Sequence, residues 1–255
     1  MQAIFFTDLD NTAIYSHRHV IEEPLVWVEE LNGQPQSFMT KKYYDYFSRQ
    51  DWLRVIPLTS RTAAQYLRLC AVSAVMKWED ALVYNGAVLL RNGVEDMSWR
   101  EESLRLSQAD QAAFQALWGK VEALYPAEAI ENFPGFMFYI KTDETGKVFE
   151  LMNGLADPAH VRVYKDSRKV YCQPASLSKG NALRRYMNMC QNAPVLAAGD
   201  SEFDISMLEQ ADICLCPESL SGQVNAAGEK IVCRGLFSDA ICDAMENIRI
   251  KGEIW

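Results

Sequence analysis

The chain begins with a short apolar run that ends in two carboxylates. Residues 3–12 read AIFFTDLDNT, so Asp8 and Asp10 follow the run and Thr12 adds a hydroxyl. A short run rich in Phe and Ile, stopped by turn-forming residues, predicts a buried parallel strand. Open α/β sheets bind their ligands at the carboxyl ends of such strands. We therefore expect a site at this end, with the turn that begins at Asn11 bringing Asp10 back beside Asp8.

Three further segments carry polar side chains at the end of an apolar run or the start of a helix. APVLAAGDSEFD reaches Asp200 and then Asp204, VIPLTSRT reaches Thr59 and Ser60, and SLSKGNALRRY carries Lys179. Each segment alone also fits a structural role, such as a capped turn, a helix N-cap or a surface lysine. Four such segments in this order, at three strand ends and one helix start, favour a single active site.

The residue types in these segments suit phosphoryl transfer. A carboxylate at the mouth of a sheet can act as a nucleophile and form an acyl phosphate, and Asp8 is the candidate. Asp10 can protonate the departing alkoxide and later deprotonate the attacking water. Thr59 can hydrogen-bond the transferring phosphoryl oxygens. Lys179 supplies a positive charge beside the nucleophile and the phosphoryl group.

The clustered acids also predict a divalent cation. We expect Asp200 to hold Mg²⁺ together with Asp8 and the backbone carbonyl of Asp10, because oxygen ligands and few protein contacts suit Mg²⁺ better than Zn²⁺. Asp204 follows one helical turn after Asp200 and either binds the water molecules of the metal or holds Lys179. The cation would also keep the neighbouring carboxylates ionised.

Composition narrows the class of protein. The 255 residues carry a net charge of −9, which argues against a nucleic-acid-binding surface. No apolar stretch is long enough to span a bilayer, and the N-terminus lacks a signal-like pattern, so we expect no membrane partner and a cytoplasmic location. Seven scattered cysteines predict free thiols rather than a disulfide framework.

Strands alternate with helices in the first and last parts of the chain. This rhythm predicts an α/β fold with a doubly wound, mostly parallel sheet. Between these parts, the alternation gives way to hairpins and an amphipathic helix, which predicts an inserted α+β domain over residues 87–174. Residues 1–86 and 175–255 then form a discontinuous core. Within the core, residues 25–40 predict a hairpin that turns at Asn32-Gly33 and forms a flap near the site.

Helices and strands are predicted from apolar spacing and from turn signals. In the core we expect helices over 41–52, 62–74, 203–210, 219–228 and 236–249, a helix that starts at 178, and strands over 53–59, 81–87, 194–200, 213–216 and 230–233. In the insert we expect a hairpin over 88–99, a helix over 107–125 with Ser107 as its N-cap, a strand over 136–142, a helix over 146–156 and two strands within 160–174.

The four motifs together resemble those of the haloacid dehalogenase superfamily: DLDNT (8–12), the LT of VIPLTSRT, Lys179 and GDSEFD (199–204). The insert resembles a C2-type cap, and VYNGAVLLRNG (83–93) is similar to the Cof-like and sugar-phosphate phosphatase branches. SKGNALRRY and GDSEFD resemble sucrose-phosphate phosphatase and its relatives. The resemblance implies a Rossmann-like core that hydrolyses a phosphate monoester with Mg²⁺ through an aspartyl phosphate.

The chain departs from the family pattern in three places. Asn11 stands where the family usually has Gly, but Asn tolerates positive φ well. The second motif reads TSR rather than TGR, so that Ser60 adds a hydrogen-bond donor or packs. The segment between Thr12 and Leu53 is long, and TSRTAAQYLRL and VEELNG also resemble a branch found beside tellurite- and stress-resistance genes.

Four residues are predicted to contact substrate. Arg61 either meets a phosphate or pairs with an acid on the core, and Asn85 either contacts substrate or forms a hinge. Thr12 and Ser60 complete the set. The predicted substrate is a small phosphorylated metabolite, with a sugar phosphate favoured. Two alternatives remain open, a phosphomutase of the same superfamily and a non-catalytic binding protein with the same fold; the oligomeric state is not predicted.

Overall fold

The computed structural model describes residues 2–190 and 193–252. The chain divides into two compact units, and each is described by itself. The first unit comprises residues 1–96 and 179–255, and the second comprises residues 97–178. Among the described residues, no helix is both long and apolar enough to cross a membrane.

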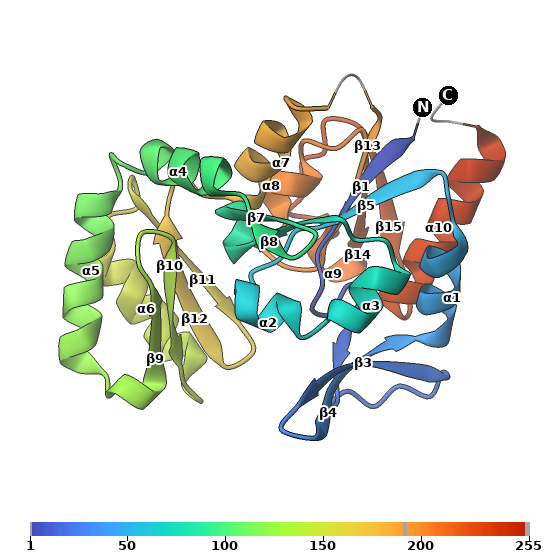
Figure 1. The fold of residues 1–255 in the computed structure, drawn as a ribbon. Helices are drawn as coiled ribbons and strands as arrows, with labels where there is room; N and C mark the ends of the chain where they lie inside the picture. The colour runs from blue at the N-terminus through green and yellow to red at the C-terminus, as the bar shows by residue number, and fades with distance from the viewer. Residues whose placement is uncertain (1, 191–192, 253–255) are drawn as a thin grey trace. The chain divides into compact units, whose positions relative to one another are not determined.

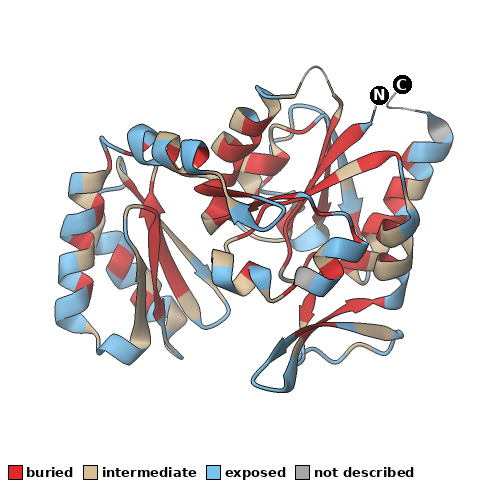
Figure 2. Cartoon of the chain, in the orientation of Figure 1, coloured by how far each residue is buried: buried red, intermediate tan, exposed pale blue. Residues whose placement is uncertain are grey.

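The first unit is built on a five-stranded parallel sheet with the order β15-β14-β13-β1-β5 (Figure 1). Figure 2 shows its central strands as mostly buried, and every residue of β1 is buried. The prediction of an α/β fold with a mostly parallel sheet is therefore confirmed. The strands are β1 (Ala3–Thr7), β5 (Leu53–Pro57), β13 (Val195–Ala198), β14 (Ile213–Pro217) and β15 (Glu229–Cys233).

Helices flank this sheet. In Figure 1, α7 and α8 lie on one side of the strands and α1 and α10 lie on the other. The first of these helices, α1, begins where the hydroxyl of Thr40 accepts a hydrogen bond from the backbone N–H of Tyr43 at 3.2 Å, which is an N-cap. The helices are α1 (Lys41–Arg49), α7 (Lys179–Met187), α8 (Ile205–Leu208), α9 (Glu218–Ser221) and α10 (Phe237–Lys251).

The helix predicted over 62–74 is wrong as a single element. It consists of two short helices, α2 (Ala63–Leu67) and α3 (Cys70–Val75). A capping box formed by Thr62 and Gln65 starts α2, but Leu69 leaves the helical region with φ −89° and ψ 13°. Apolar spacing continues across this break, so the spacing alone did not reveal it.

Two smaller sheets accompany the core. One has the order β2-β4-β3, and its hairpin turns at Asn32 (φ 54°) and Gly33 (φ 72°), as predicted. The other has the order β6-β7-β8 and also turns at an Asn-Gly pair. A 3₁₀ turn, η1 (Tyr84–Gly86), joins β6 to β7. The strands are β2 (Tyr15–Ser16), β3 (Leu25–Leu31), β4 (Gln34–Thr40), β6 (Asp80–Val83), β7 (Val88–Arg91) and β8 (Val94–Glu95).

The sequence and the structure divide the chain at different residues. The prediction ended the first core segment at residue 86, whereas the compact unit extends to Asp96. The reason is that β7 pairs with β6 and β8 pairs with β7, which ties this hairpin to the first unit. The interpretation of the two units as a catalytic core and a cap stays a prediction.

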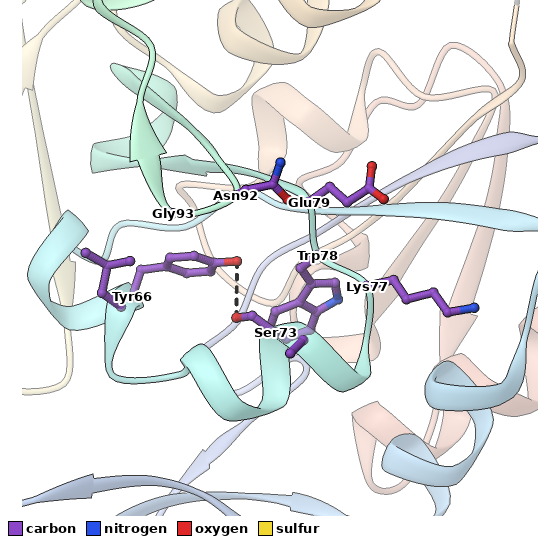
Figure 3. A pocket seen from close by; sticks show the side chains of 9 residues that line it. Tyr66, Ser73, Lys77, Trp78, Glu79, Asn92 and Gly93 are labelled. Carbon is purple, nitrogen blue, oxygen red and sulfur yellow. Dashed lines mark hydrogen bonds between the residues drawn. The ribbon is translucent and has the colours of Figure 1, made fainter.

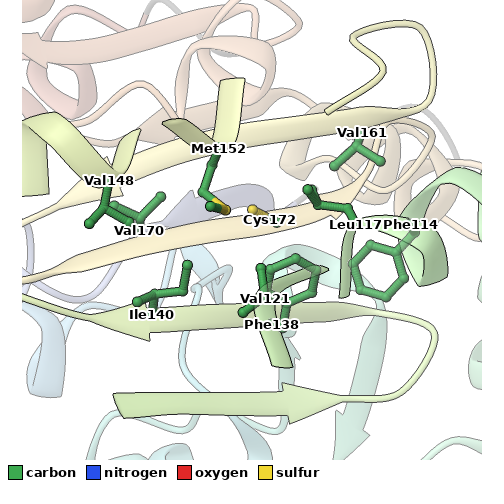
Figure 4. Packing of buried hydrophobic residues seen from close by; sticks show 10 residues of the cluster. All are labelled: Phe114, Leu117, Val121, Phe138, Ile140, Val148, Met152, Val161, Val170 and Cys172. Carbon is green, nitrogen blue, oxygen red and sulfur yellow. The ribbon is translucent and has the colours of Figure 1, made fainter. Parts of the chain in front are cut away.

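The second unit is a four-stranded antiparallel sheet with the order β11-β12-β10-β9 and accompanying helices. Phe138 and Ile140 alternate along β10 and face a cluster of apolar side chains from α5 and α6 (Figure 4). The elements are α4 (Met97–Leu106), α5 (Gln111–Leu124), η2 (Ala127–Ala129), β9 (Ile130–Phe133), β10 (Met137–Lys141), α6 (Thr145–Leu155), β11 (Val161–Asp166) and β12 (Lys169–Pro174).

The predicted start of the second-unit helix at Ser107 is also wrong. The helix α5 begins at Gln111, because the hydroxyl of Ser107 donates back to the carbonyl of Leu104 at 3.2 Å instead of capping a new helix. The carboxylate of Asp110 accepts hydrogen bonds from the backbone N–H and hydroxyl of Ser176 at 2.9 and 2.6 Å. Ser107 therefore bonds within its own turn and Asp110 serves a long-range contact, so neither forms the predicted cap.

Two adjacent residues of α6 provide a test of the second unit's core. Met152 is fully buried in the cluster, whereas Leu151 is 44% exposed. We expect Met152→Ala to lower the free energy of unfolding by about 2–5 kcal/mol, through lost burial and the cavity that remains. The matched variant Leu151→Ala should change it by less than about 0.5 kcal/mol. Chemical denaturation of the full chain measures both, and equal losses would contradict this packing.

Candidate active site

The predicted site residues follow the carboxyl ends of three neighbouring strands. Thr7 at the end of β1 lies in register with Ala198 of β13 and Pro57 of β5. The ladder continues beyond β1, because the backbone N–H of Asp8 donates to the carbonyl of Ala198 at 2.9 Å. The sheet therefore delivers Asp8, the loop after β13 and the loop after β5 to one edge.

A tight turn follows the first carboxylate. The carbonyl of Leu9 accepts hydrogen bonds from the backbone N–H groups of Thr12, Ala13 and Ile14, at 3.2, 2.9 and 2.8 Å. Asn11 adopts φ 61°, so it takes the left-handed conformation for which Gly is usually required. The turn brings the hydroxyl of Thr12 within 3.1 Å of a carboxylate oxygen of Asp200, to which it donates.

A buried lysine connects two of the carboxylates. Lys179, the first residue of α7, donates from Nζ to Oδ1 of Asp8 at 2.5 Å and to Oδ1 of Asp204 at 2.6 Å. Its side chain is 1% exposed. Burial alone would lower the pKa of Lys179, but the charges of Asp204 and Asp8 outweigh burial and raise the pKa above its ordinary value. The ammonium therefore remains charged.

The second carboxylate oxygen of Asp204 organises the loop after β13. Oδ2 accepts hydrogen bonds from the backbone N–H groups of Asp200 and Ser201 at 3.1 and 3.0 Å, and from the hydroxyl of Ser201 at 2.9 Å. A Cβ at Gly199 would lie 2.3 Å from Cβ of Asp204, so only glycine lets the loop close over this side chain. Of the two roles predicted for Asp204, the geometry matches the one that holds Lys179.

The carboxylates of Asp8, Asp200 and Asp204 could hold a metal ion. Each offers one oxygen, and these oxygens lie within 4.8 Å of one another. Oxygen donors alone suit Mg²⁺. Burial and the charges of Asp204 and Asp200 raise the pKa of Asp8 well above its ordinary value, against the opposing effect of Lys179. A bound cation would lower the pKa of Asp8, as Lys179 does, and so keep this carboxylate ionised. These residues therefore fit the predicted ion.

Asp10 is held by an arginine instead of joining that group. Arg61 donates from Nε to Oδ2 of Asp10 and from Nη2 to Oδ1 of Asp10, both at 2.8 Å. Its Nη1 donates to Oε2 of Glu29 at 3.0 Å. Of the alternatives left open for Arg61, the structure has the pairing with an acid; a contact with phosphate stays a prediction.

Sequence reasoning missed Glu29. The residue lies on β3 and is buried, and Oε1 accepts a hydrogen bond from Nε of Arg68 at 2.8 Å. The β3–β4 register shifts between Trp27 and Glu29, which leaves Val28 as the extra residue of a β-bulge. Strict alternation along VWVEEL cannot locate such a bulge. The only available signal was a run of acidic residues in the predicted flap.

The loop after β5 carries the remaining predicted residues. The hydroxyl of Thr59 accepts the backbone N–H of Arg61 at 3.2 Å, and the carbonyl of Thr59 accepts the backbone N–H of Asn85 at 2.8 Å. Asn85 adopts φ 53° within η1 and is buried. These bonds hold the two loops together. Substrate contacts by Thr12, Ser60 and Asn85 stay predictions.

The first unit also has a pocket of about 430 Å³ that none of the predicted site residues lines (Figure 3). Tyr66 and Ser73 form part of its wall, with a hydrogen bond between their hydroxyls at 3.4 Å. Trp78, Asn92 and Gly93 lie on the other sides. The pocket belongs to the packing of α2 and α3 against the β7–β8 turn, and it contains no carboxylate of the candidate active site.

Residues 125–234 match the family model of haloacid dehalogenase-like hydrolases, a stretch that includes Lys179, Asp200 and Asp204. A search of curated proteins finds no match. Among solved structures, the sucrose-phosphatase of Synechocystis sp. PCC6803, in complex with sucrose and phosphate, is similar over 98% of both chains, with 17% identity and a TM-score of 0.65.

Two further solved structures have the same arrangement. A sugar phosphatase of haloacid dehalogenase subclass IIB is 13% identical over 98% of this chain and 100% of its own, with a TM-score of 0.63. A phosphatase of the superfamily from Bacteroides thetaiotaomicron is 12% identical over 98% and 96%, with a TM-score of 0.57. The chain has the haloacid dehalogenase-like hydrolase fold. The predicted resemblance is confirmed, and the hydrolase family match supports the prediction of an enzyme.

Within this haloacid dehalogenase-like fold, the charge of Glu29 provides a pH-dependent test. Burial alone would raise its pKa, but Arg61, Ser37 and Arg68 outweigh burial and lower it below the ordinary value of 4.5. A carboxyl with a depressed folded-state pKa stabilises the fold above its unfolded pKa, and this contribution is lost as the pH falls through the folded pKa.

We therefore expect Glu29→Gln to lower the free energy of unfolding by about 3 kcal/mol at neutral pH. The difference from wild type should shrink as the pH falls below the ordinary range of glutamate and through the depressed pKa of Glu29, where this carboxyl becomes protonated. Denaturant unfolding of both proteins across this range measures the effect. A difference that stayed constant with pH would assign the loss to packing instead of charge.

Proposed function

We propose that the chain is a Mg²⁺-dependent phosphatase that hydrolyses a small phosphorylated metabolite through an aspartyl phosphate on Asp8. One observation carries the proposal. Lys179 holds one carboxylate oxygen of Asp8, Oδ1, at 2.5 Å, and the described residues donate no hydrogen bond to the other, Oδ2. That arrangement fixes the carboxylate and leaves one oxygen to attack phosphorus.

In the first step, an oxygen of Asp8 bonds to phosphorus and the ester P–O bond breaks. The departing alkoxide takes a proton from Asp10, whose side chain is 40% exposed and so within reach of a bound substrate. The hydroxyl of Thr59 accepts the backbone N–H of Arg61, which leaves its own proton to donate to a phosphoryl oxygen. Lys179 stabilises negative charge beside the reacting atoms.

In the second step, water attacks phosphorus and the bond to Asp8 breaks. Asp10, now ionised, takes the proton of the water and returns to its starting state. The products are inorganic phosphate and the regenerated carboxylate of Asp8. Asp8 and Asp200 would hold Mg²⁺, with the carbonyl of Asp10 as the third predicted ligand. The ion supplies positive charge against the phosphoryl oxygens and the clustered acids.

The comparisons support a proposal for the substrate class. Similar structures include a sucrose-phosphatase and a subclass IIB sugar phosphatase, which favours a sugar phosphate for this chain. We assign the second unit, residues 97–178, the role of a cap that limits access of water. A phosphomutase would share Asp8 and Asp10, and product analysis with a hexose 1-phosphate distinguishes it from a phosphatase. The cytoplasmic location expected from the sequence stays a prediction.

Replacement of the nucleophile tests the proposal. We expect Asp8→Asn to reduce phosphate release from a panel of phosphorylated sugars by at least about 10³-fold, because an amide cannot form the phosphoenzyme. The control Asp45→Asn removes a surface carboxylate paired with Lys41 and should retain wild-type rates. Turnover in Asp8→Asn comparable to wild type, or a wild type that releases no phosphate from any compound, would overturn the proposal.

Removal of divalent cations provides a second test. We expect EDTA to abolish phosphate release and added Mg²⁺ to restore it, because Asp8 and Asp200 need a cation between them. Isothermal titration calorimetry with Mg²⁺ alone gives a readout independent of activity. The variant Asp200→Asn should weaken this binding at least about tenfold. Full activity after EDTA treatment would count against the cation.

A further inference from the structure

We propose that Glu29 is a positioning residue for the general acid Asp10 and acts on it through Arg61. This inference rests on the proposed function, because it assigns Asp10 the task of protonating the leaving group. Glu29 lies outside the four motifs, on the β3–β4 hairpin. Its link to the site is therefore a property of this chain's long segment between Thr12 and Leu53.

The contacts form one continuous chain of charges. Arg61 binds both oxygens of Asp10 through Nε and Nη2 and binds Glu29 through Nη1. Glu29 in turn accepts hydrogen bonds from Arg68 at 2.8 Å and from the hydroxyl of Ser37 at 2.6 Å. A guanidinium donates in a fixed plane, so holding Nη1 also sets the direction of the two N–H groups that hold Asp10.

Solvent exposure rises from Glu29 through Arg61 to Asp10, as expected if Glu29 positions Asp10. The side chain of Glu29 is 2% exposed, that of Arg61 is 10% exposed and that of Asp10 is 40% exposed. Glu29 is therefore held within the packed interior, whereas Asp10 is accessible to a substrate. A carboxylate that must meet a leaving oxygen needs such support, because a displacement of about 1 Å can cost about 10²-fold in rate.

The β-bulge at Val28 explains how a residue on the hairpin becomes the anchor. Val28 and Glu29 are both buried, which strict alternation along a strand does not produce. The bulge lets Glu29 pair with Ser37 across the hairpin while its side chain reaches Arg61. The hairpin thus contributes a charged side chain directly to the arginine that holds Asp10.

Positioning of the acid has a chemical signature that a purely structural role lacks. A general acid accelerates the departure of a poor leaving group strongly and that of a good one weakly. Phenyl phosphate and p-nitrophenyl phosphate have nearly the same shape, but phenolate is the poorer leaving group. We therefore expect Glu29→Gln to lower kcat/KM for phenyl phosphate about tenfold more than for p-nitrophenyl phosphate, with KM changed less than about twofold.

The experiment compares the full-length variants with Mg²⁺ at a temperature where circular dichroism shows each to be folded. Arg61→Gln and the double variant complete a cycle, in which Glu29→Gln should cost less than about twofold once Arg61 is gone. Ser37→Ala retains every charge and removes only the hydroxyl on Glu29, so it should shift the leaving-group ratio in the same direction by about two- to threefold. It keeps the test informative if Glu29→Gln does not fold.

The matched control is Asp80→Asn. Asp80 is a buried acid of the same unit that pairs with Arg54 and Arg91 and does not contact Asp10 or Arg61. We expect this variant to lose stability without any change in the ratio between the two substrates.

The positioning role would be overturned if Glu29→Gln lowered kcat/KM equally for both phosphates, or if the effects of Glu29→Gln and Arg61→Gln were independent in the double variant. Turnover by the wild type would still leave the phosphatase assignment intact. A wild type that hydrolyses neither compound would overturn both.

Discussion

The buried ammonium of Lys179 between Asp8 and Asp204 is the interaction on which the site depends. Removing an ion from water costs several kcal/mol, and two carboxylates at 2.5 and 2.6 Å offset that cost only while the geometry is held. The three side chains come from the end of β1, the start of α7 and the loop after β13. The parallel sheet is what brings these distant segments to one edge.

The two ionic networks of the first unit differ in charge balance. In the network of Asp10, Arg61, Glu29 and Arg68, two acids meet two guanidinium groups, so the charges cancel whenever both acids are ionised. Around Lys179, the carboxylates of Asp8, Asp200 and Asp204 outnumber the single ammonium. The first network needs no further ion to be stable. The second retains an excess of negative charge, which adds to the effect of burial in raising the pKa of Asp8 and explains why these residues fit a divalent cation.

The sequence predicted the parts of the site that depend on local patterns. Apolar runs that stop at Asp8, Thr59 and Asp200 mark strand ends, and parallel pairing then brings those ends together. The same reasoning could not find the break at Leu69 or the capping failure at Ser107, where apolar spacing or a polar residue mimicked a local signal.

Glu29 was missed for a related reason. Its burial depends on a bulge in strand pairing and on an arginine from the loop after β5, and neither is encoded in the residues next to it. Cross-strand register and long-range ion pairs are tertiary properties. For this chain, sequence patterns therefore pointed to the proposed reacting groups more readily than to the residues that hold them in place.

The charge balance also limits how an anionic substrate can be bound. A net charge of −9 opposes the approach of a phosphate monoester, and both strong cations of the site already serve carboxylates. All three nitrogens of the Arg61 guanidinium already donate to Asp10 or Glu29. Arg61 is therefore a weaker binding group for a phosphate than its charge alone suggests. Under the proposed function, the positive charge that attracts the substrate would come chiefly from a bound divalent ion. In the proposed reaction, the divalent ion would therefore serve substrate binding as well as chemistry, while Arg61 holds Asp10.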